Sequence, residues 1–150
     1  MNLSPHFTLE EMVRTGQSSL QTANTSEAAQ FNGALKDVCV TLLEPIRAKF
    51  GPVRVTSGFR GTSVNKAVGG SPTSQHSKGE AADIVCPAVT VDELHRWIVV
   101  ESGIAFGQCI LEKPGSSVWV HISLGAPYRD PKRCGESLYF DGKTYTPKRY

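Results

Sequence analysis

The amino-acid sequence predicts an α+β fold with a small, mostly antiparallel sheet and helices packed on it. Helical patterns come first along the chain, short strand-like apolar runs come later, and turn residues join those runs closely. At 150 residues the chain is long enough to bury a core, and we expect one domain over residues 1–150.

The first third of the chain is predicted to be helical. Thr8-Leu-Glu-Glu11 is a capping box that opens a short helix ending near Gly16. A polar stretch, Gln17–Ser26, then leads into a long helix that Gly51-Pro52 ends, and Pro45 should kink or restart that helix. The apolar stripe that predicts it consists of Phe31, Leu35, Val38, Leu42, Ile46 and Phe50.

The middle of the chain alternates strands and loops with one more helix. Val53–Thr56 and Glu80–Cys86 are predicted strands, and the glycine-rich residues 58–74 between them are predicted to be loop. Thr90-Val-Asp-Glu93 is a second capping box, which opens a helix over residues 91–101.

Two strands and a hairpin complete the predicted sheet. Apolar runs at Gln108–Glu112 and Val118–Ser123 flank a short linker that contains proline and glycine. Near the end, Leu138–Tyr145 contains Asp141-Gly142, which predicts a hairpin with a type I′ turn.

Composition argues against several classes of protein. The net charge of +2 is too small to favour nucleic acid, and no apolar run approaches the roughly 18–20 residues that span a bilayer. Residues 1–6 show no basic segment followed by an apolar one, so we expect no secretory signal. The expected location is therefore the cytoplasm, unless another route releases the protein.

The four cysteines are scattered, and none forms a CxxC pair, so a cysteine zinc site is not expected. Buried free thiols fit a cytoplasmic protein better than disulfides do. These cysteines are Cys39, Cys86, Cys109 and Cys134.

Three residues, His76, Asp83 and His121, suggest a metal site. His76 lies in a loop rich in serine and glycine, whereas Asp83 interrupts an apolar strand, where a buried carboxylate is costly unless paired or metal-bound. Two imidazoles and one carboxylate can hold a catalytic zinc with a fourth position open to water. A structural His–Asp pair is the alternative. His6 and His95 lack such neighbours and are interpreted as surface or packed residues.

Strand periodicity places the two strand-borne ligands opposite the predicted core. Asp83 shares a face with Ala81 and Val85, and His121 shares a face with Trp119. The residues that face the other way are Ala82, Ile84 and Cys86 in the first strand and Val118, Val120 and Ile122 in the second.

The run Ser74-x-His76-x-x-Gly79-x-Ala81-x-Asp83, with the later Trp119-x-His121, resembles the signature of the zinc D-Ala-D-Ala carboxypeptidase and L-Ala–D-Glu endopeptidase family. Its superfamily includes lysostaphin-type peptidases and hedgehog signalling domains. The opening residues, Leu3–Glu11, resemble short phage-type members, and the resemblance covers about residues 3–125. It implies zinc bound by His76, Asp83 and His121, and hydrolysis of peptide bonds in peptidoglycan stems.

The resemblance also implies roles around the metal. Arg60 matches an arginine that stabilises the oxyanion or holds a substrate carboxylate, with a surface ion pair as the alternative. Ser74 is expected to orient the loop or hold a substrate group. Gln75 and Asn65 would present polar groups to the peptide, and Trp119 would be a substrate wall or part of the core.

The general base departs from the family pattern. Relatives often carry an acidic residue or histidine two or three positions before the last ligand, where this chain has Val118 and Trp119. The nearest carboxylate is Glu112. A register that puts it on the face of His121 would aim it at the metal, whereas the alternative is a solvated carboxylate beside Lys113.

Three functions stay open at this stage. The first is a zinc peptidase of endolysin type, released by a holin or carried on a phage particle. The second is a wall-binding module with zinc but little catalysis, and the third is a phage structural domain in which the site only stabilises the fold. The His2Asp set suits zinc, although manganese or cobalt could occupy it. For a peptidase, both D-Ala-D-Ala carboxypeptidase and murein endopeptidase action are consistent with the sequence.

Overall fold

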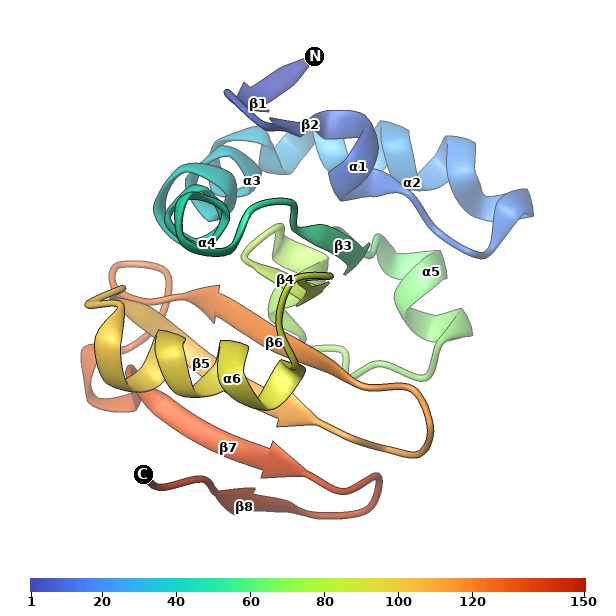
Figure 1. Cartoon of the computed structure of the whole chain (residues 1–150). Helices are drawn as coiled ribbons and strands as arrows, with labels where there is room; N and C mark the ends of the chain where they lie inside the picture. The colour runs from blue at the N-terminus through green and yellow to red at the C-terminus, as the bar shows by residue number, and fades with distance from the viewer.

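The computed structural model describes residues 1–150 and confirms the predicted α+β class (Figure 1). A short pair, β1 (Asn2–Ser4) and β2 (Phe7–Thr8), opens the chain. The main sheet contains β3 (Arg54–Ser57), β4 (Ala81–Val85), β5 (Phe106–Glu112), β6 (Trp119–Leu124), β7 (Glu136–Phe140) and β8 (Tyr145–Pro147). Its strand order is β3-β4-β6-β5-β7-β8, and every pair is antiparallel except β5 with β7.

Six α-helices and several tighter or wider turns connect these strands. The α-helices are α1 (Leu9–Val13), α2 (Gln21–Ala28), α3 (Asn32–Asp37), α4 (Glu44–Phe50), α5 (Thr62–Ala67) and α6 (Val91–Arg96). The π-helical segments are η3 (Val38–Leu43) and η5 (Trp97–Glu101). The 3₁₀ turns are η1 (Ser18–Leu20), η2 (Ala29–Phe31), η4 (Gln75–Lys78) and η6 (Pro131–Arg133).

The core lies between one face of the sheet and the helices, as strand periodicity predicted. From β4 and β6, Ile84 and Ile122 enter the core, where they join Leu42 of η3 and Leu94 of α6. The long helix formed by α3, η3 and α4 therefore covers the same face of the sheet as α6, because both pack in the core with β4 and β6 (Figure 1). The opposite face carries Asp83 and His121, because side chains alternate along a strand.

Pro45 has the predicted effect on the long helix. Proline lacks the N–H that would bond to the carbonyl one turn earlier, so regular α-helix cannot run through it unchanged. The backbone widens into η3 before it, and α4 restarts with Pro45 in its first turn. Gly51 ends α4 with a φ of 81°, a conformation that glycine adopts without steric cost.

Two segments predicted to be irregular are helical instead. The polar stretch Gln17–Ser26 contains most of α2, whose buried Asn24 donates to the carbonyls of Val13 and Phe59. Within residues 58–74, α5 begins at Thr62, whose amide and hydroxyl donate to Glu27 of α2. Both helices depend on tertiary partners, so the local pattern did not reveal them.

Two smaller expectations about the sheet are also wrong. Val118 is 37% exposed rather than in the core, because β6 begins one residue later. The hairpin from β7 to β8 exists, but its turn is not type I′, which needs positive φ at both central residues. Only Gly142 has positive φ, and the Asp141 carboxylate accepts from the amides of Lys143 and Thr144.

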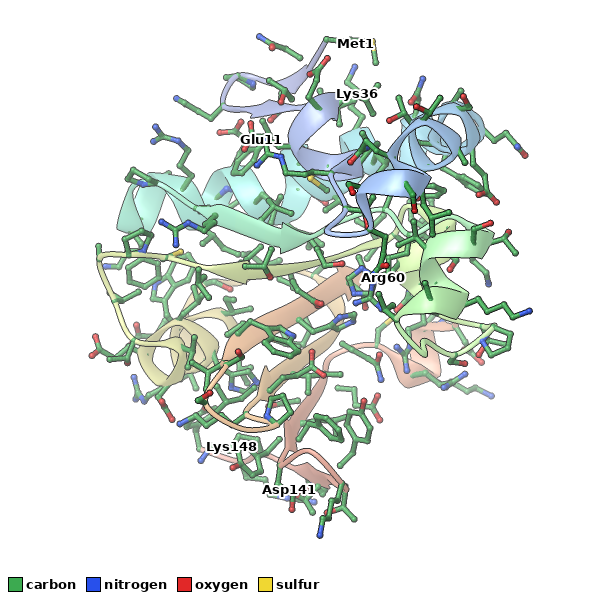
Figure 2. The ribbon with its side chains drawn as sticks, turned by 90° about the vertical axis from the view of Figure 1, so that its right-hand side faces the viewer. Met1, Glu11, Lys36, Arg60, Asp141 and Lys148 are labelled. Atoms are coloured by element: carbon green, nitrogen blue, oxygen red, sulfur yellow. The ribbon has the colours of Figure 1, made fainter.

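Along the molecule, Met1 lies at one end and the turn at Asp141 lies at the other, with Arg60 between them (Figure 2). None of the helices is long and apolar enough to cross a lipid bilayer. Arg60 lies in the loop between β3 and α5, beside the face of the sheet that carries Asp83 and His121.

Candidate metal centre and active site

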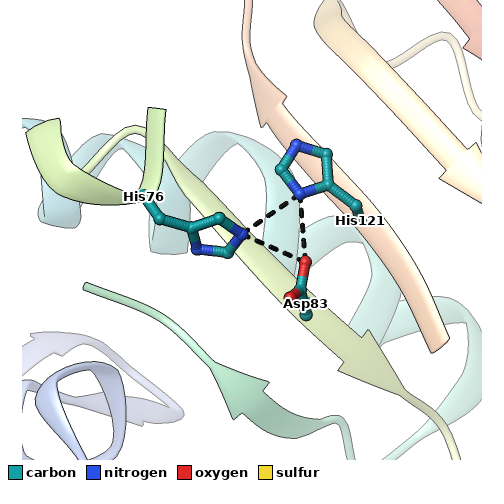
Figure 3. Close-up of side chains that lie close together, drawn as sticks. All are labelled: His76, Asp83 and His121. Atoms are coloured by element: carbon teal, nitrogen blue, oxygen red, sulfur yellow. Dashed lines mark hydrogen bonds and ion pairs between the residues drawn. The ribbon is translucent and has the colours of Figure 1, made fainter. Parts of the chain in front are cut away.

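His76, Asp83 and His121 converge on one point (Figure 3). The Oδ1 atom of Asp83 lies 3.1 Å from Nε2 of His76 and 3.0 Å from Nδ1 of His121, and the two nitrogens are 3.2 Å apart. Tetrahedral zinc with ligand bonds of about 2.0–2.1 Å would separate its ligand atoms by about 3.3 Å. The triangle therefore has the size that a zinc ion requires.

Two neighbouring strands and one tight turn deliver the three side chains. Asp83 of β4 and His121 of β6 are direct partners in the ladder, so both project from the same face at close spacing. His76 comes from η4, where the Ser74 hydroxyl accepts from the His76 amide. Gly79 ends that turn with a φ of 69°, and an added Cβ would meet Phe31 at 3.0 Å.

The protonation pattern of the three side chains favours a cation. Nδ1 of His76 lies 2.7 Å from the Gly58 carbonyl oxygen, which can only accept, so this nitrogen carries the proton. A neutral His76 ring then presents the lone pair of Nε2 to the Asp83 carboxylate and to His121. Lone pairs that converge in a buried site repel one another unless a cation or proton lies between them, and metal-binding histidines are oriented in this way.

Asp83 is buried, with 4% of its surface exposed. Burial alone would raise its pKa, but when the imidazoles are protonated, the charge of His76 and hydrogen bonds from both rings hold the pKa well below its usual range; when the rings are neutral, a bound cation would act in the same direction. Its second oxygen accepts from Nη2 of Arg60 at 3.1 Å. The carboxylate is therefore ionised, as a metal ligand must be.

Arg60 supports this carboxylate from the loop after β3. Besides the Asp83 contact, its Nε donates to the Ser57 hydroxyl at 3.0 Å, and its backbone amide donates to the His76 carbonyl at 3.0 Å. The guanidinium is thus anchored beside the candidate metal ligands rather than in a surface ion pair, and Arg60 also lines the cavity described below.

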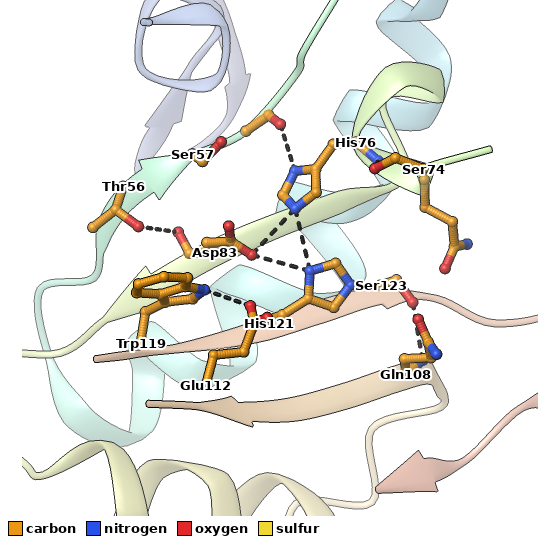
Figure 4. A network of polar contacts seen from close by, with 12 residues as sticks. Thr56, Ser57, Ser74, His76, Asp83, Gln108, Glu112, Trp119, His121 and Ser123 are labelled. Atoms are coloured by element: carbon orange, nitrogen blue, oxygen red, sulfur yellow. Dashed lines mark hydrogen bonds and ion pairs between the residues drawn. The ribbon is translucent and has the colours of Figure 1, made fainter. Parts of the chain in front are cut away.

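Glu112 ends β5 on the ligand face, in the register that the sequence left open. It pairs with Trp119 across the ladder, and the Trp119 indole N–H donates to its carboxylate (Figure 4). Burial raises the pKa of Glu112, and the negative charge of Asp83 raises it further. A carboxylate held in this way beside two candidate ligands has the placement and the pKa direction of a general base.

A polar cavity of about 680 Å³ opens over these groups. His76, His121, Glu112 and Arg60 all line it, which places the candidate ligands and the candidate base in one space. Its size falls within the range of ligand pockets, about 300–1,000 Å³.

The residues suggested as substrate contacts have different positions. Ser74 and Gln75 line the cavity, whereas Trp119 and Asn65 do not. Trp119 instead orients Glu112, and Asn65 is buried, where its amide donates to the Ser71 carbonyl. Of the four residues suggested as substrate contacts, Ser74 and Gln75 are thus the two that face the cavity.

Part of the cavity wall comes from residues that sequence reasoning did not single out. Tyr128, Arg129, Leu138 and Tyr145 all follow β6, and each lines the cavity. No motif marks them: Tyr128 and Arg129 come from the turn after β6, whereas Leu138 and Tyr145 reach the site through the pairing of β7 with β5 and of β8 with β7.

The cysteines and the other two histidines lie outside the cavity. All four cysteines are free, and burial raises the pKa of Cys39 to about 12 and that of Cys86 to about 11, so both are inert thiols. His6 lies at the surface beside Glu44. His95 is packed, with Nε2 bonded to the Cys109 carbonyl and Nδ1 to the Tyr150 hydroxyl.

The fold and the site together define a class of protein. Three convergent metal-type ligands, a nearby carboxylate of raised pKa and a polar cavity are the arrangement of a metal-dependent hydrolase. The family model of Peptidase M15 matches residues 5–123, so the chain belongs to this family of zinc-dependent metallopeptidases. This confirms the resemblance noted from the signature residues. A comparison with curated proteins gave no match.

Proposed function

We propose that the protein hydrolyses peptide bonds in the stem peptides of peptidoglycan, as a single zinc peptidase domain over residues 1–150. The observation that carries the proposal is the convergence of His76, Asp83 and His121 beside Glu112 in one cavity. Membership of the M15 family supports the metal and the peptidase chemistry.

In this proposal, His76, Asp83 and His121 hold the zinc, with Arg60 fixing the orientation of Asp83. A zinc ion bound there would lower the pKa of a water molecule and polarise the scissile carbonyl. Glu112 takes the proton that the water loses, and Trp119 holds its carboxylate in place. Glu112 then passes that proton to the departing amine nitrogen, which balances the cleavage of the C–N bond.

The polar wall suits a short peptide with carboxylates and amides. Ser74 and Gln75 present hydrogen-bonding groups at one side of the cavity, and Lys78 and Arg133 add positive charge at its rim. These groups can bind either a terminal carboxylate or an internal acidic residue, so carboxypeptidase and endopeptidase action both fit. The partner would be the cell-wall peptide, reached after holin-dependent release or on a phage particle.

The test is the release of new amino groups from purified peptidoglycan. The protein is assayed as purified, after chelation, and after zinc is restored, and mass spectrometry of the products names the bond. Release that is lost on chelation and regained with zinc supports the proposal. The matched control is Glu112→Gln, which keeps the ligand set and should keep its zinc.

A different result would favour another function. If wild-type protein holds one zinc per chain and releases no amines, the peptidase proposal fails. Binding to intact peptidoglycan under those conditions would then indicate a wall-binding module. Loss of stability on chelation without such binding would indicate a structural domain.

A further inference from the structure

The last part of the chain completes the cavity but lies outside the family match. Peptidase M15 covers residues 5–123, whereas Leu138 of β7 and Tyr145 of β8 line the cavity from beyond that range. These strands extend the ligand face of the sheet by two strands, or about 10 Å at normal strand spacing. The catalytic contribution of this segment therefore has to be argued from this chain's own residues.

Most of the expected hydrogen-bond donor of the site, the Arg60 guanidinium, is committed to other partners. Peptide hydrolysis places negative charge on the carbonyl oxygen, and a positioned donor stabilises that charge. Arg60 was expected in this role, but its Nη2 and Nε are already bonded to Asp83 and Ser57. Only Nη1 has no hydrogen-bond partner in the protein, so a second donor in the cavity would share the stabilisation of the oxyanion with Arg60.

Tyr145 is the candidate for this second donor. A row of paired residues crosses the ligand face from Trp119 to Glu112, then to Phe140, then to Tyr145. The Tyr145 ring stacks on Phe140 with ring centres 4.3 Å apart and planes 23° apart, which limits the directions the ring can take. Tyr145 is 56% exposed and lines the cavity that His76, His121 and Glu112 also line.

The hydroxyl of Tyr145 is free and protonated. No hydrogen bond within the protein uses it, in contrast to Tyr128 in the same cavity, whose hydroxyl donates to Asp37. Partial burial raises the pKa of Tyr145, and the negative charges of Glu112 and Asp83 raise it further. A phenol in this field keeps its proton at neutral pH and can donate it in a hydrogen bond.

We infer that Tyr145 is a further catalytic residue, whose hydroxyl donates a hydrogen bond to the scissile carbonyl oxygen as that oxygen gains negative charge. The inference rests on the proposed function. The oxygen of water bonds to the carbonyl carbon, the C–N bond breaks, and the proton of the water travels through Glu112 to the leaving nitrogen. The Tyr145 proton stays on its own oxygen throughout, so this residue stabilises charge without transferring a proton.

The first test compares Tyr145→Phe with Tyr139→Phe in amine release. Tyr145→Phe keeps the ring on Phe140 and removes only the hydroxyl, so kcat should fall by about 100-fold, as for loss of one oxyanion donor. KM and the zinc content should change little. Tyr139 lies on the opposite face of β7 and packs against the core, so Tyr139→Phe should leave kcat unchanged. A Tyr145→Phe variant with wild-type kcat would overturn the inference.

The second test needs no activity. The tyrosinate absorbance of the wild type minus that of Tyr145→Phe reports the titration of Tyr145 alone. In the chelated protein, Glu112→Gln should lower the pKa of Tyr145, because one of the two carboxylate charges disappears. An unchanged pKa would show that the hydroxyl does not face the site, and would overturn the inference independently of kinetics.

The two proposals fail in different ways. Wild-type protein without amine release would remove the peptidase proposal, and the catalytic role of Tyr145 with it. Active wild-type protein with an equally active Tyr145→Phe variant would remove only the role of Tyr145.

Discussion

The strands that carry the candidate ligands, β4 and β6, differ from the edge hairpin β7–β8 in burial and in function. In β4, four of five residues are buried, whereas all three residues of β8 are exposed. The metal-type ligands Asp83 and His121 lie on the neighbouring interior strands β4 and β6, while the cavity wall extends onto β7 and β8 at the edge. A triangle of three ligand atoms tolerates little movement, so it needs strands fixed on both sides. A substrate wall can lie on a more exposed edge.

The largest effect on the ligand-bearing strands β4 and β6 is expected from His121→Ala. The variant removes one of the three ligand atoms and leaves Asp83 and His76 to hold the ion, so zinc affinity should fall by more than about 100-fold, beyond the usual cost of losing a supporting contact. Amine release should become undetectable. Zinc content after dialysis measures the effect, with the surface variant His6→Gln as the control. One zinc per chain in His121→Ala would contradict the ligand assignment.

Glu112→Gln tests the role of β5, which lies between the ligand strand β6 and the edge strand β7. We expect kcat to fall by about 10²–10⁴-fold with zinc retained, because the amide cannot accept the proton of water. Since burial and Asp83 raise the pKa of Glu112, wild-type activity should be present above that pKa and disappear as the pH falls through it. The acid limb of kcat/KM should therefore lie above about 4.3, the ordinary value for Glu. An acid limb at or below that value would count against Glu112 as the base.

Substitutions in β6 and in β8 should differ in their effect on the unfolding free energy, as the two strands differ in burial. Ile122→Ala removes a fully buried side chain of β6 and should cost about 2–5 kcal/mol of unfolding free energy. Tyr145→Ala loses mainly one cross-strand stack and should cost less than about 1 kcal/mol. Urea denaturation of both variants gives the comparison. Equal losses would mean that the edge hairpin is as strongly coupled to the core as β6.

Arg60→Ala tests whether Arg60 orients the candidate ligand Asp83 or contacts the substrate. Loss of its contact with Asp83 should reduce zinc affinity by about 10–100-fold, the range seen when a residue that orients a ligand is removed. Competition with a chelator of known affinity measures this. An increase in KM with unchanged zinc affinity would instead show that Arg60 serves the substrate.

The smallest effect concerns His95, which ties the end of the chain to the core through Tyr150 and Cys109. Burial lowers the pKa of His95 in the folded state, so below the unfolded value of about 6.5 the unfolded chain binds this proton more readily. Stability should be full above that pH and decline below it, until the lowered folded pKa is reached. In His95→Gln, whose amide can replace both hydrogen bonds, the unfolding free energy should fall less between pH 7 and pH 5. Identical slopes would exclude His95 as the cause.

Local sequence pattern was a good guide where one interaction dominates. The capping box at Thr8 forms as predicted, because its partners are three residues apart. The alternation in β4 and β6 placed Asp83 and His121 opposite the core, because burial of apolar side chains determines which face of a strand turns inward. The helices α2 and α5 were missed because Asn24 and Glu27 stabilise them across the fold.

By itself, the sequence determined the fold class, the ligand candidates and the family, since these depend on residue types at short, regular spacing. Only the tertiary structure decided that Glu112 faces the cavity, that Arg60 binds Asp83, and that Tyr145 reaches the same space. Those positions depend on strand register and on the pairing of β7 and β8 with β5, which join residues far apart in the chain. Such pairing is a property of the whole packed sheet, so no local pattern records it.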